Sequence, residues 1–420
     1  MNVSALGKPR FASPIRRTVD DRARIPAEIV RLPGKTPRKE RLFELAGPRP
    51  KLFFEPRSTR AGVVTCGGLC PGLNDVVRSL FLELHHAYGL REVLGFRGGY
   101  QGLDPTRGEE PIVLTPDFVD HIHQQGGTVL GTSRGPVDVH VAVDNLIRRQ
   151  VDILFTIGGD GTQRGGNDFY QEAKRRGYPL AVVGIPKTVD NDVPYVARTF
   201  GYLTAVQEAT HVLDRAHTES KSVQNGISLV KLMGRHAGFI AAGATMASQD
   251  VNFTLVPEVP FKLDGPRGFL AALKERILKR HHAVIVVAEG AGQDLPVRRK
   301  AACDASGNVK LQDIGLFLRE RIEDYFKTEG VPMVMRYFDP SYFVRSSPAN
   351  SEDSILCDLF ARHAAHAAMA GKTGLVIGFL HNQFIHVPIE LITQEKKRLD
   401  PAGPAWSAVL AATGQPHRFG

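Results

Sequence analysis

Leu154-Phe-Thr-Ile-Gly-Gly-Asp-Gly-Thr162 is the stretch that decides the fold, and Gly184-Ile-Pro-Lys-Thr-Val-Asp-Asn-Asp192 follows a similar pattern further along the chain. Each stretch continues an apolar, β-branched run, at residues 151–157 and 180–185, which predicts a buried strand of a parallel sheet. Each run then breaks into glycine-rich or polar residues. Because open α/β sheets bind ligands at the carboxyl ends of their strands, the sequence predicts an α/β fold with a ligand site at these breaks.

The first break, Gly158-Gly159-Asp160-Gly161-Thr162, has the residue types that a phosphate site needs. Glycines let the backbone approach a polyphosphate closely, and their amide groups can point at its oxygens. Asp160 offers a hard carboxylate oxygen for Mg²⁺. Taken alone, the motif is equally compatible with a tight turn between a strand and a helix.

The second break places two carboxylates, Asp190 and Asp192, beside the hydroxyl of Thr188 and the ammonium of Lys187. A carboxylate next to a phosphate site can accept the proton of an attacking alcohol. Two such breaks in one chain favour phosphoryl transfer over a pair of simple turns.

The composition is that of a globular protein with two domains or one large α/β unit: 420 residues, 42% apolar and 23% charged. The formal charge of +9 raises the question of a nucleic-acid partner, but the Lys and Arg residues are dispersed and no nucleic-acid motif accompanies them. No apolar run approaches the ~20 residues of a membrane span. Four cysteines are too few and too dispersed for a disulfide framework: Cys66, Cys70, Cys303 and Cys357. Cys66 and Cys70 could form half of a zinc site, but no matching ligand pair follows, so both are expected to pack as small apolar residues in a reducing cytoplasm.

Strands and helices are expected to alternate after residue 57, which predicts mostly parallel sheets. Residues 1–57 are rich in Pro and Arg and are expected to form an arm over the core or over a partner subunit. Beyond the two runs above, strands are expected at 60–66, 227–232, 251–256, 283–288 and 373–379, and a short one starts at 93. Helices are expected from about 75, at about 199–215 and at 391–398.

Other polar turns could serve the same chemistry. Gly67-Gly-Leu-Cys-Pro-Gly-Leu-Asn74 is a glycine-rich turn from strand to helix, although it is not an ordinary P-loop. Arg134, in a tight loop, suits a phosphate clamp better than a plain surface charge. Arg235, at the end of a strand, suits an anionic ligand. Glu289 suits a sugar hydroxyl or, alternatively, a helix cap.

Four motifs together resemble the 6-phosphofructokinases: Gly-Gly-Leu-Cys-Pro-Gly-Leu-Asn, Gly-Gly-Asp-Gly-Thr, Pro-Lys-Thr-Val-Asp-Asn-Asp and Met-Gly-Arg-His-Ala-Gly-Phe. The likeness runs from about Arg60 to at least Arg345, and is greatest to the long branch found in plants and trypanosomatids. It implies two Rossmann-like, doubly wound domains with the active site in the cleft between them. The nucleotide domain would take 58–200 with about 346–390, and the fructose 6-phosphate domain 201–345 with about 391–420.

The resemblance also implies roles for matched residues. Asp190 would be the general base for the 1-hydroxyl of fructose 6-phosphate, and Asp160 would serve Mg²⁺. The other catalytic positions are Thr188, Asp192, Arg235 and Lys187. The nucleotide phosphate site would comprise Gly68, Arg134, Gly135, Gly158, Gly159, Asp160, Gly161 and Thr162. The sugar-phosphate site would comprise Thr188, Asp190, Met233, Gly234, Arg235, Glu289, Tyr342 and Arg345.

The phosphoryl donor depends on two positions. An Asp at the position of Gly161 marks pyrophosphate users in this family, so the small, neutral Gly161 favours ATP. Lys187 is found in pyrophosphate enzymes, but the branch resembled here combines Gly with Lys and uses ATP. ATP is therefore predicted, with pyrophosphate as the alternative. NAD kinases and lipid kinases are weaker alternatives, because neither is expected to pair Pro-Lys-Thr-Val-Asp-Asn-Asp with Met-Gly-Arg. A non-catalytic regulatory subunit is also weaker, because Asp160, Asp190 and Arg235 are all present.

The resemblance further implies a cytoplasmic, glycolytic homotetramer or homodimer. Gly226 stands where many bacterial members carry an Arg that reaches a neighbouring subunit. Arg78 matches a bacterial effector-binding Arg, but its partners do not match. The bacterial regulation by ADP and phosphoenolpyruvate is therefore expected to be absent or rebuilt.

Overall fold

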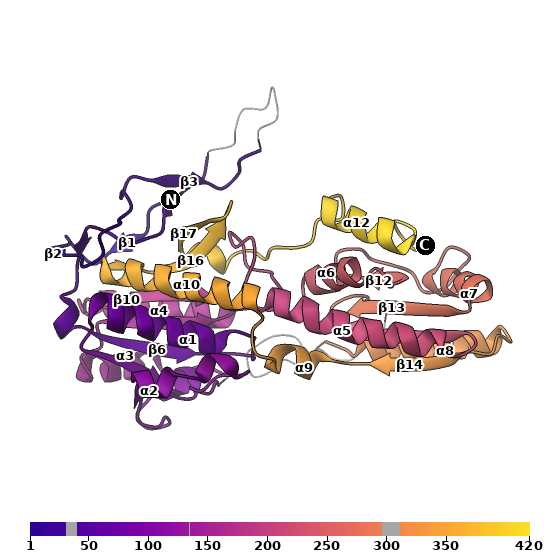
Figure 1. Cartoon of the computed structure of the whole chain (residues 1–420), viewed down its shortest axis with the longest axis horizontal. Helices are drawn as coiled ribbons and strands as arrows, with labels where there is room; N and C mark the ends of the chain where they lie inside the picture. Colours follow the sequence, from indigo (N-terminus) through magenta and orange to yellow (C-terminus); the bar gives the residue numbers. More distant parts are fainter. Residues whose placement is uncertain (31–39, 134, 296–310) are drawn as a thin grey trace. The chain divides into compact units, whose positions relative to one another are not determined.

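A computed structural model describes residues 1–30, 40–133, 135–295 and 311–420. The chain forms two compact units, which Figure 1 shows together. Unit 1 comprises Met1–Thr188, Val193–Gly201 and Ser347–Lys396, and unit 2 comprises Val189–Asp192, Tyr202–Ser346 and Lys397–Gly420.

The centre of unit 1 is a parallel, doubly wound sheet. Five of the nine strands lie in the order β7 (Glu92–Phe96), β6 (Arg60–Thr65), β9 (Ile153–Gly158), β10 (Ala181–Pro186) and β16 (Leu375–Leu380), with each neighbouring pair parallel. Their chain order reverses between β6 and β9. Ligands bind at such a reversal point, outside the carboxyl ends of the strands. The predicted α/β class is confirmed in this unit.

Antiparallel strands extend both edges of this sheet. β8 (Ile112–Val113) pairs with β7, and on the other side β17 (Gln383–Pro388), β4 (Leu42–Leu45) and β3 (Arg24–Pro26) follow β16. Two short pairs lie apart from the sheet: β1 (Ser4–Ala5) with β15 (Lys372–Thr373), and β2 (Phe11–Ala12) with β5 (Lys51–Leu52). These amino-terminal strands were not predicted from the sequence, because partners far along the chain, rather than any local period, decide their pairing.

The helices of unit 1 are α1 (Leu73–Leu82), α2 (Pro116–Val119), α3 (Val139–Arg148), α4 (Asp160–Arg175), α10 (Ser351–Met369) and α11 (Ile389–Ile392). Figure 1 shows α1 and α10 side by side, and they are in contact. Gly72 precedes α1 with a φ of 94°, and a Cβ there would lie 2.4 Å from the Cys357 sulfur of α10. Glycine is therefore required for this approach. Cys66 and Cys70 are buried as expected, whereas Cys303 lies outside the described residues.

Unit 2 holds an all-parallel sheet of four strands in the order β12 (Phe253–Leu255), β13 (His282–Ala288), β11 (Gly226–Leu232) and β14 (Val334–Phe338). Its helices are α5 (Tyr202–Lys221), α6 (Phe239–Ser248), α7 (Phe269–Arg280), α8 (Ile314–Thr328), α9 (Ser341–Ser346) and α12 (Pro404–Thr413). Leu229, Ile285 and Phe326 belong to its buried core. Because the strands are parallel, the carboxyl ends of β11, β13 and β14 meet at one edge.

The helix expected at 391–398 is wrong. α11 ends at Ile392, and residues 395–400 are irregular. The amide of Lys397 instead donates to the carbonyl of Asp192 (2.9 Å), and the amide of Leu399 donates to the Glu258 carboxylate (2.9 Å). These tertiary acceptors replace the carbonyls that a helix would have supplied. Among the described helices, none is long and apolar enough to cross a membrane.

The buried side chain of Gln163 fastens the ends of β9 and β10 together. Its amide nitrogen donates to the carbonyl of Gly158 (2.9 Å) and to that of Ile185 (3.2 Å). Gly184 makes room for it, since a Cβ at this position would lie 2.1 Å from the Gln163 oxygen. Gln163 thus helps to hold the two strand ends level.

We expect Gln163→Leu to lower the free energy of unfolding by about 1–3 kcal/mol, because it removes these bonds from buried carbonyls. Denaturant titration measures the change. Gln171→Leu, at an exposed position of the same helix, is the matched control and should change stability by less than about 0.5 kcal/mol. Equal effects of the two substitutions would contradict this role of Gln163.

Candidate active site

The first candidate cluster lies in unit 1, where β6, β9 and β10 end. The amide of Lys187, after β10, donates to the carbonyl of Gly158 (3.1 Å), and its ammonium donates to the carbonyl of Gly68, after β6. Three loops that were singled out in the sequence are therefore in contact at the reversal point of the sheet. The side chain of Lys187 is buried, so its charge is held within this cluster.

The turn from β9 into α4 leaves open space for a ligand. A Cβ on Gly158 would lie 2.1 Å from the Thr162 hydroxyl, so this position admits only glycine. A Cβ on Gly161, by contrast, would meet no atom within 4 Å. Gly159 precedes the helix and has no side chain to cap its first amide groups. The amino terminus of the 16-residue helix α4 is thus available to an anion.

Asp160 is the first residue of α4, and its carboxylate pairs with the ammonium of Lys396 at 2.5 Å. Both side chains are partly exposed, at 21% and 29%. Among the residues with described positions, no group of three His, Cys, Asp or Glu is arranged to hold a metal ion. Mg²⁺ is often bound by one or two carboxylates together with waters and substrate phosphates, so the lone Asp160 fits an ion that arrives with a nucleotide.

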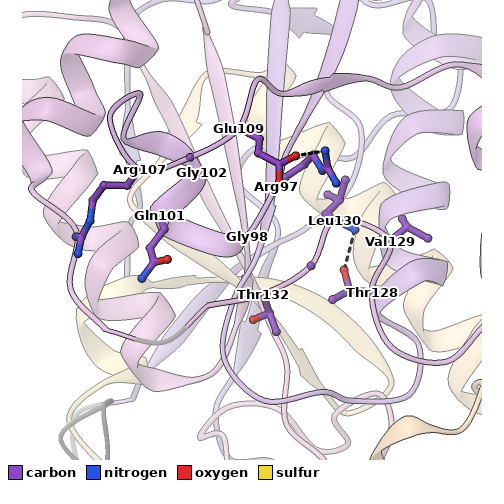
Figure 2. Close-up of a pocket in the computed structure, with 12 residues that line it drawn as sticks. Arg97, Gly98, Gln101, Gly102, Arg107, Glu109, Thr128, Val129, Leu130 and Thr132 are labelled. Atoms are coloured by element: carbon purple, nitrogen blue, oxygen red, sulfur yellow. Dashed lines mark hydrogen bonds and ion pairs between the residues drawn. The ribbon is translucent and has the colours of Figure 1, made fainter.

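A polar cavity of about 420 Å³ lies beside this cluster. Figure 2 shows Gln101 and Arg107 on one part of its wall, and Arg97 on another part beside Glu109 and Leu130. The Thr132 hydroxyl donates to the carbonyl of Gly67 (2.7 Å), next to Gly68, so the cavity adjoins the loop after β6. Its size falls in the usual range for small-molecule sites.

The sequence predicted the short strand that starts at 93, but not the side chains that line this cavity. Arg97 is paired with Glu109, and the Gly98 amide donates to the carbonyl of Leu130 (2.8 Å). The adjacent glycines at 98 and 99, both of which have positive φ, could have indicated a tight turn at this place in the sequence. Gly135 also has a positive φ, of 108°, whereas Arg134 lies outside the described residues.

The second candidate cluster lies in unit 2, at the carboxyl ends of β11 and β13. The amide of Arg235 donates to the carboxylate of Asp190 at 3.4 Å. Gly234 has a φ of 132°, and a Cβ there would lie 2.7 Å from the Ala237 carbonyl. Glu289, which follows β13, donates its amide to the carbonyl of Leu232 (2.9 Å). The predicted base, arginine and sugar-binding carboxylate therefore lie on one sheet edge, together with the half-buried Met233.

The segment 190–192 is held in a conformation that suits its sequence. Asn191 has a φ of 55°, a left-handed conformation that Asn tolerates better than most residues. Its side-chain oxygen accepts from the ammonium of Lys397 (3.0 Å), whose amide bonds the carbonyl of Asp192. Lys397 was not predicted as a site residue, because only the fold brings it to this segment.

The charges around Glu289 alter its titration. Burial raises the pKa of the Glu289 carboxyl, and the nearby Arg235 and Lys231 oppose that rise. Lys231 itself pairs with Asp313 (2.8 Å) and Asp339 (2.9 Å), and these partners raise its pKa against the effect of burial. This edge therefore alternates acidic and basic groups.

Tyr342 and Arg345 lie on the short helix α9. The Arg345 guanidinium stacks on the Tyr342 ring, 4.5 Å from its centroid, and the Tyr342 side chain is largely exposed. Arg345 is close enough to Glu289 to lower the pKa of that carboxyl slightly. Both residues can therefore contribute to an anion site on the same edge.

Comparison with known proteins decides the family. The model of the phosphofructokinase family, "Phosphofructokinase", matches residues 60–368. The chain belongs to this family. The resemblance inferred from the four motifs is confirmed.

Individual relatives are similar over most of their length. The "ATP-dependent 6-phosphofructokinase" of Borreliella burgdorferi is 45% identical over 95% of this chain and 91% of its own. The protein of the same name from Trypanosoma brucei brucei is 45% identical over 89% of this chain and 76% of its own. A crystal structure of the "Pyrophosphate-dependent phosphofructokinase" from Marinobacter aquaeolei has a TM-score of 0.70 and 20% identity, covering 86% of this chain and 93% of that one. That last likeness supports the fold alone.

Lys397 should make stability depend on pH in a predictable direction. Burial lowers its pKa from the ordinary 10.5 to about 8, although Asp192 opposes the change. Between about pH 8 and 10.5 the unfolded chain therefore binds more protons than the folded one, and Lys397 makes stability rise with pH across this window.

We expect Lys397→Met to remove that contribution, so the difference in unfolding free energy between variant and wild type should change by up to about 1.4 kcal/mol per pH unit. Urea titrations at several pH values measure it. For Lys327→Met, at an exposed position of the same unit, the unfolding free energy should change with pH in parallel with that of the wild type. A parallel curve for Lys397→Met would show that this ammonium keeps its ordinary pKa.

Proposed function

We propose that this protein is an ATP-dependent 6-phosphofructokinase, which transfers the γ-phosphoryl group of MgATP to the 1-hydroxyl of fructose 6-phosphate. The products are fructose 1,6-bisphosphate and ADP. The observation that carries the proposal is the contact between Asp190 and Arg235, a potential base beside a potential phosphate ligand at the edge of a parallel sheet. The names of relatives at 45% identity support the same reaction.

Asp190 is the general base in this proposal: it accepts the proton of the 1-hydroxyl as the oxygen attacks the phosphoryl group. The Arg235 amide holds its carboxylate at 3.4 Å, and the Arg235 guanidinium compensates charge on the transferring group. Thr188 and Asp192 flank the same hydroxyl, and Lys187 adds positive charge. Phosphoryl transfer asks for positioning and charge compensation, which these residues can supply.

The loops of unit 1 would hold the nucleotide. Gly68, Gly135 and the turn Gly158–Thr162 offer backbone groups to the phosphates, and Arg134 would clamp them. The neighbouring cavity has room for the nucleoside. Asp160 would hold Mg²⁺ together with the phosphates, and the ion would supply charge neutralisation.

Unit 2 would hold the sugar phosphate. Glu289 accepts from a sugar hydroxyl, and Arg235 and Arg345 bind the phosphate. Met233, Gly234 and Tyr342 shape the rest of the site. The pKa of Glu289, raised by burial, suits a carboxyl that exchanges hydrogen bonds with hydroxyls.

The open space beside Gly161 favours ATP over pyrophosphate, since it leaves room for an α-phosphate. Lys187 is compatible with ATP, because its ammonium is bonded to the Gly68 carbonyl. We further infer a cytoplasmic, glycolytic homotetramer or homodimer. The Arg found at the position of Gly226 in bacterial members has no room here, because a Cβ there would lie 2.1 Å from the Ser220 carbonyl.

Asp190→Asn keeps the size of the side chain and removes its basicity. We expect kcat to fall by about 10²–10⁴-fold, with a much smaller change in KM for fructose 6-phosphate. A coupled assay of fructose 1,6-bisphosphate formation measures both constants. Asp214→Asn, an exposed position on α5, is the control and should behave as the wild type. A kcat within a few-fold of wild type for Asp190→Asn would exclude it as the base.

The donor is tested by initial rates with Mg²⁺, fructose 6-phosphate and either ATP or pyrophosphate. We expect turnover with ATP alone, and Gly161→Asp should lower kcat/KM for ATP by at least about tenfold, since like charges repel by several kcal/mol at close range. Gly161→Ala adds size without charge, so its kcat/KM for ATP should fall much less. Turnover with pyrophosphate alone would overturn the assignment of ATP. No turnover with either donor would favour the non-catalytic regulatory subunit.

A further inference from the structure

Asp160 already has a cationic partner within its own unit. The ammonium of Lys396 lies 2.5 Å from one oxygen of the Asp160 carboxylate. Lys396 follows α11, and α11 packs against α4, the helix that Asp160 begins. The pair is therefore positioned by the packing of two helices, and both of its side chains are less than one-third exposed.

This pair competes directly with the proposed role of Asp160. Mg²⁺ binds a carboxylate oxygen at about 2.1 Å and carries twice the charge of an ammonium. An ammonium in contact with the same carboxylate and a divalent ion repel each other strongly, and the contact is shielded from much of the solvent. Mg²⁺ at Asp160 therefore requires the ammonium to move away.

We propose that Lys396 is the counter-ion of Asp160 in the absence of metal, and that Mg²⁺ arriving with the nucleotide displaces the Lys396 ammonium from the carboxylate. This inference deepens the proposed function and rests on it. Without the metal, Lys396 neutralises Asp160, so a nucleotide phosphate is not repelled from the amino terminus of α4. With the metal, the displaced ammonium remains near the phosphates on its flexible stem.

Lys396 directly precedes Lys397, which contacts the segment of the proposed base. Lys396 is the last residue of unit 1, and Lys397 opens the final segment of unit 2. Lys397 holds Asn191 and Asp192 by its side chain and its amide. Lys396, which pairs with the proposed metal ligand Asp160, is therefore joined by one peptide bond to Lys397, which anchors the segment of the proposed base.

The proposed exchange predicts that loss of the Lys396 ammonium weakens ADP binding without Mg²⁺ and increases the gain in affinity that Mg²⁺ gives. In Lys396→Met, Asp160 keeps an uncompensated charge, so ADP in EDTA should bind more weakly than to the wild type. Mg²⁺ no longer displaces an ammonium, so it should improve ADP binding more than in the wild type. We expect the ratio of Kd in EDTA to Kd in Mg²⁺ to rise at least about threefold.

Isothermal titration with ADP measures this ratio without turnover. Lys396→Arg keeps the charge and should stay close to the wild-type ratio. Lys174→Met, in the last turn of α4, removes the same charge from the same helix away from Asp160 and should leave the ratio unchanged. Thermal unfolding of each variant in EDTA checks that the folds are equivalent.

The outcomes separate this inference from the proposed function. An unchanged ratio in Lys396→Met, or the same change in Lys174→Met, would overturn the exchange alone. The expected ratios with no phosphorylation of fructose 6-phosphate by the wild type would support the exchange and overturn the proposed function. Absence of any ADP binding by the wild type would overturn both.

Discussion

The parallel pairing of β9 with β6 and β10 is the constraint on which the rest of the site depends. Ile157 lies beside Thr65 on one side and Ile185 on the other, and Gly158 pairs with Pro186. Since all three strands run in one direction, the loops that follow them begin at the same level. The contact of Lys187 with Gly68 and Gly158 follows directly from this register. A shift by one residue would turn each side chain to the opposite face of the sheet.

The sequence predicted the parts of the fold that local pattern controls. The buried runs, the glycine-rich turns and the α/β class could be predicted, because apolar β-branched residues and glycines restrict the backbone locally. The short strands before Arg60 and the irregular segment after α11 could not. Their backbone groups bond partners far along the chain, such as Asp192 for Lys397, and no local period records those partners. α12 was missed too, although the pair Gly403-Pro404 before it and Gly414 after it are signals for the ends of a helix.

The residues of the candidate site also fall into those that local sequence motifs indicate and those that only the fold brings together. Motif residues such as Asp160, Asp190 and Arg235 could be singled out as candidates, because their types suit phosphate chemistry and their neighbours indicate a turn. Residues that contact the motifs only in the folded chain could not be predicted, because a single lysine or glutamine belongs to no recognisable motif. Gln163 holds the strand ends, and Lys396 meets Asp160, but each is recognisable only once α4 has been packed on the sheet and α11 against it.

The electrostatics of the two clusters follow from a conflict that any kinase of small phosphorylated molecules must resolve. The chemistry needs carboxylates, yet carboxylates repel the phosphates that must bind beside them. Here cations lie close to the acidic groups: Lys396 faces Asp160, Lys231 is shared by Asp313 and Asp339, and Arg235 and Lys231 act on Glu289. A nearby cation lowers the repulsion between these carboxylates and an incoming phosphate. A net charge of +9 is consistent with substrates that carry phosphate groups.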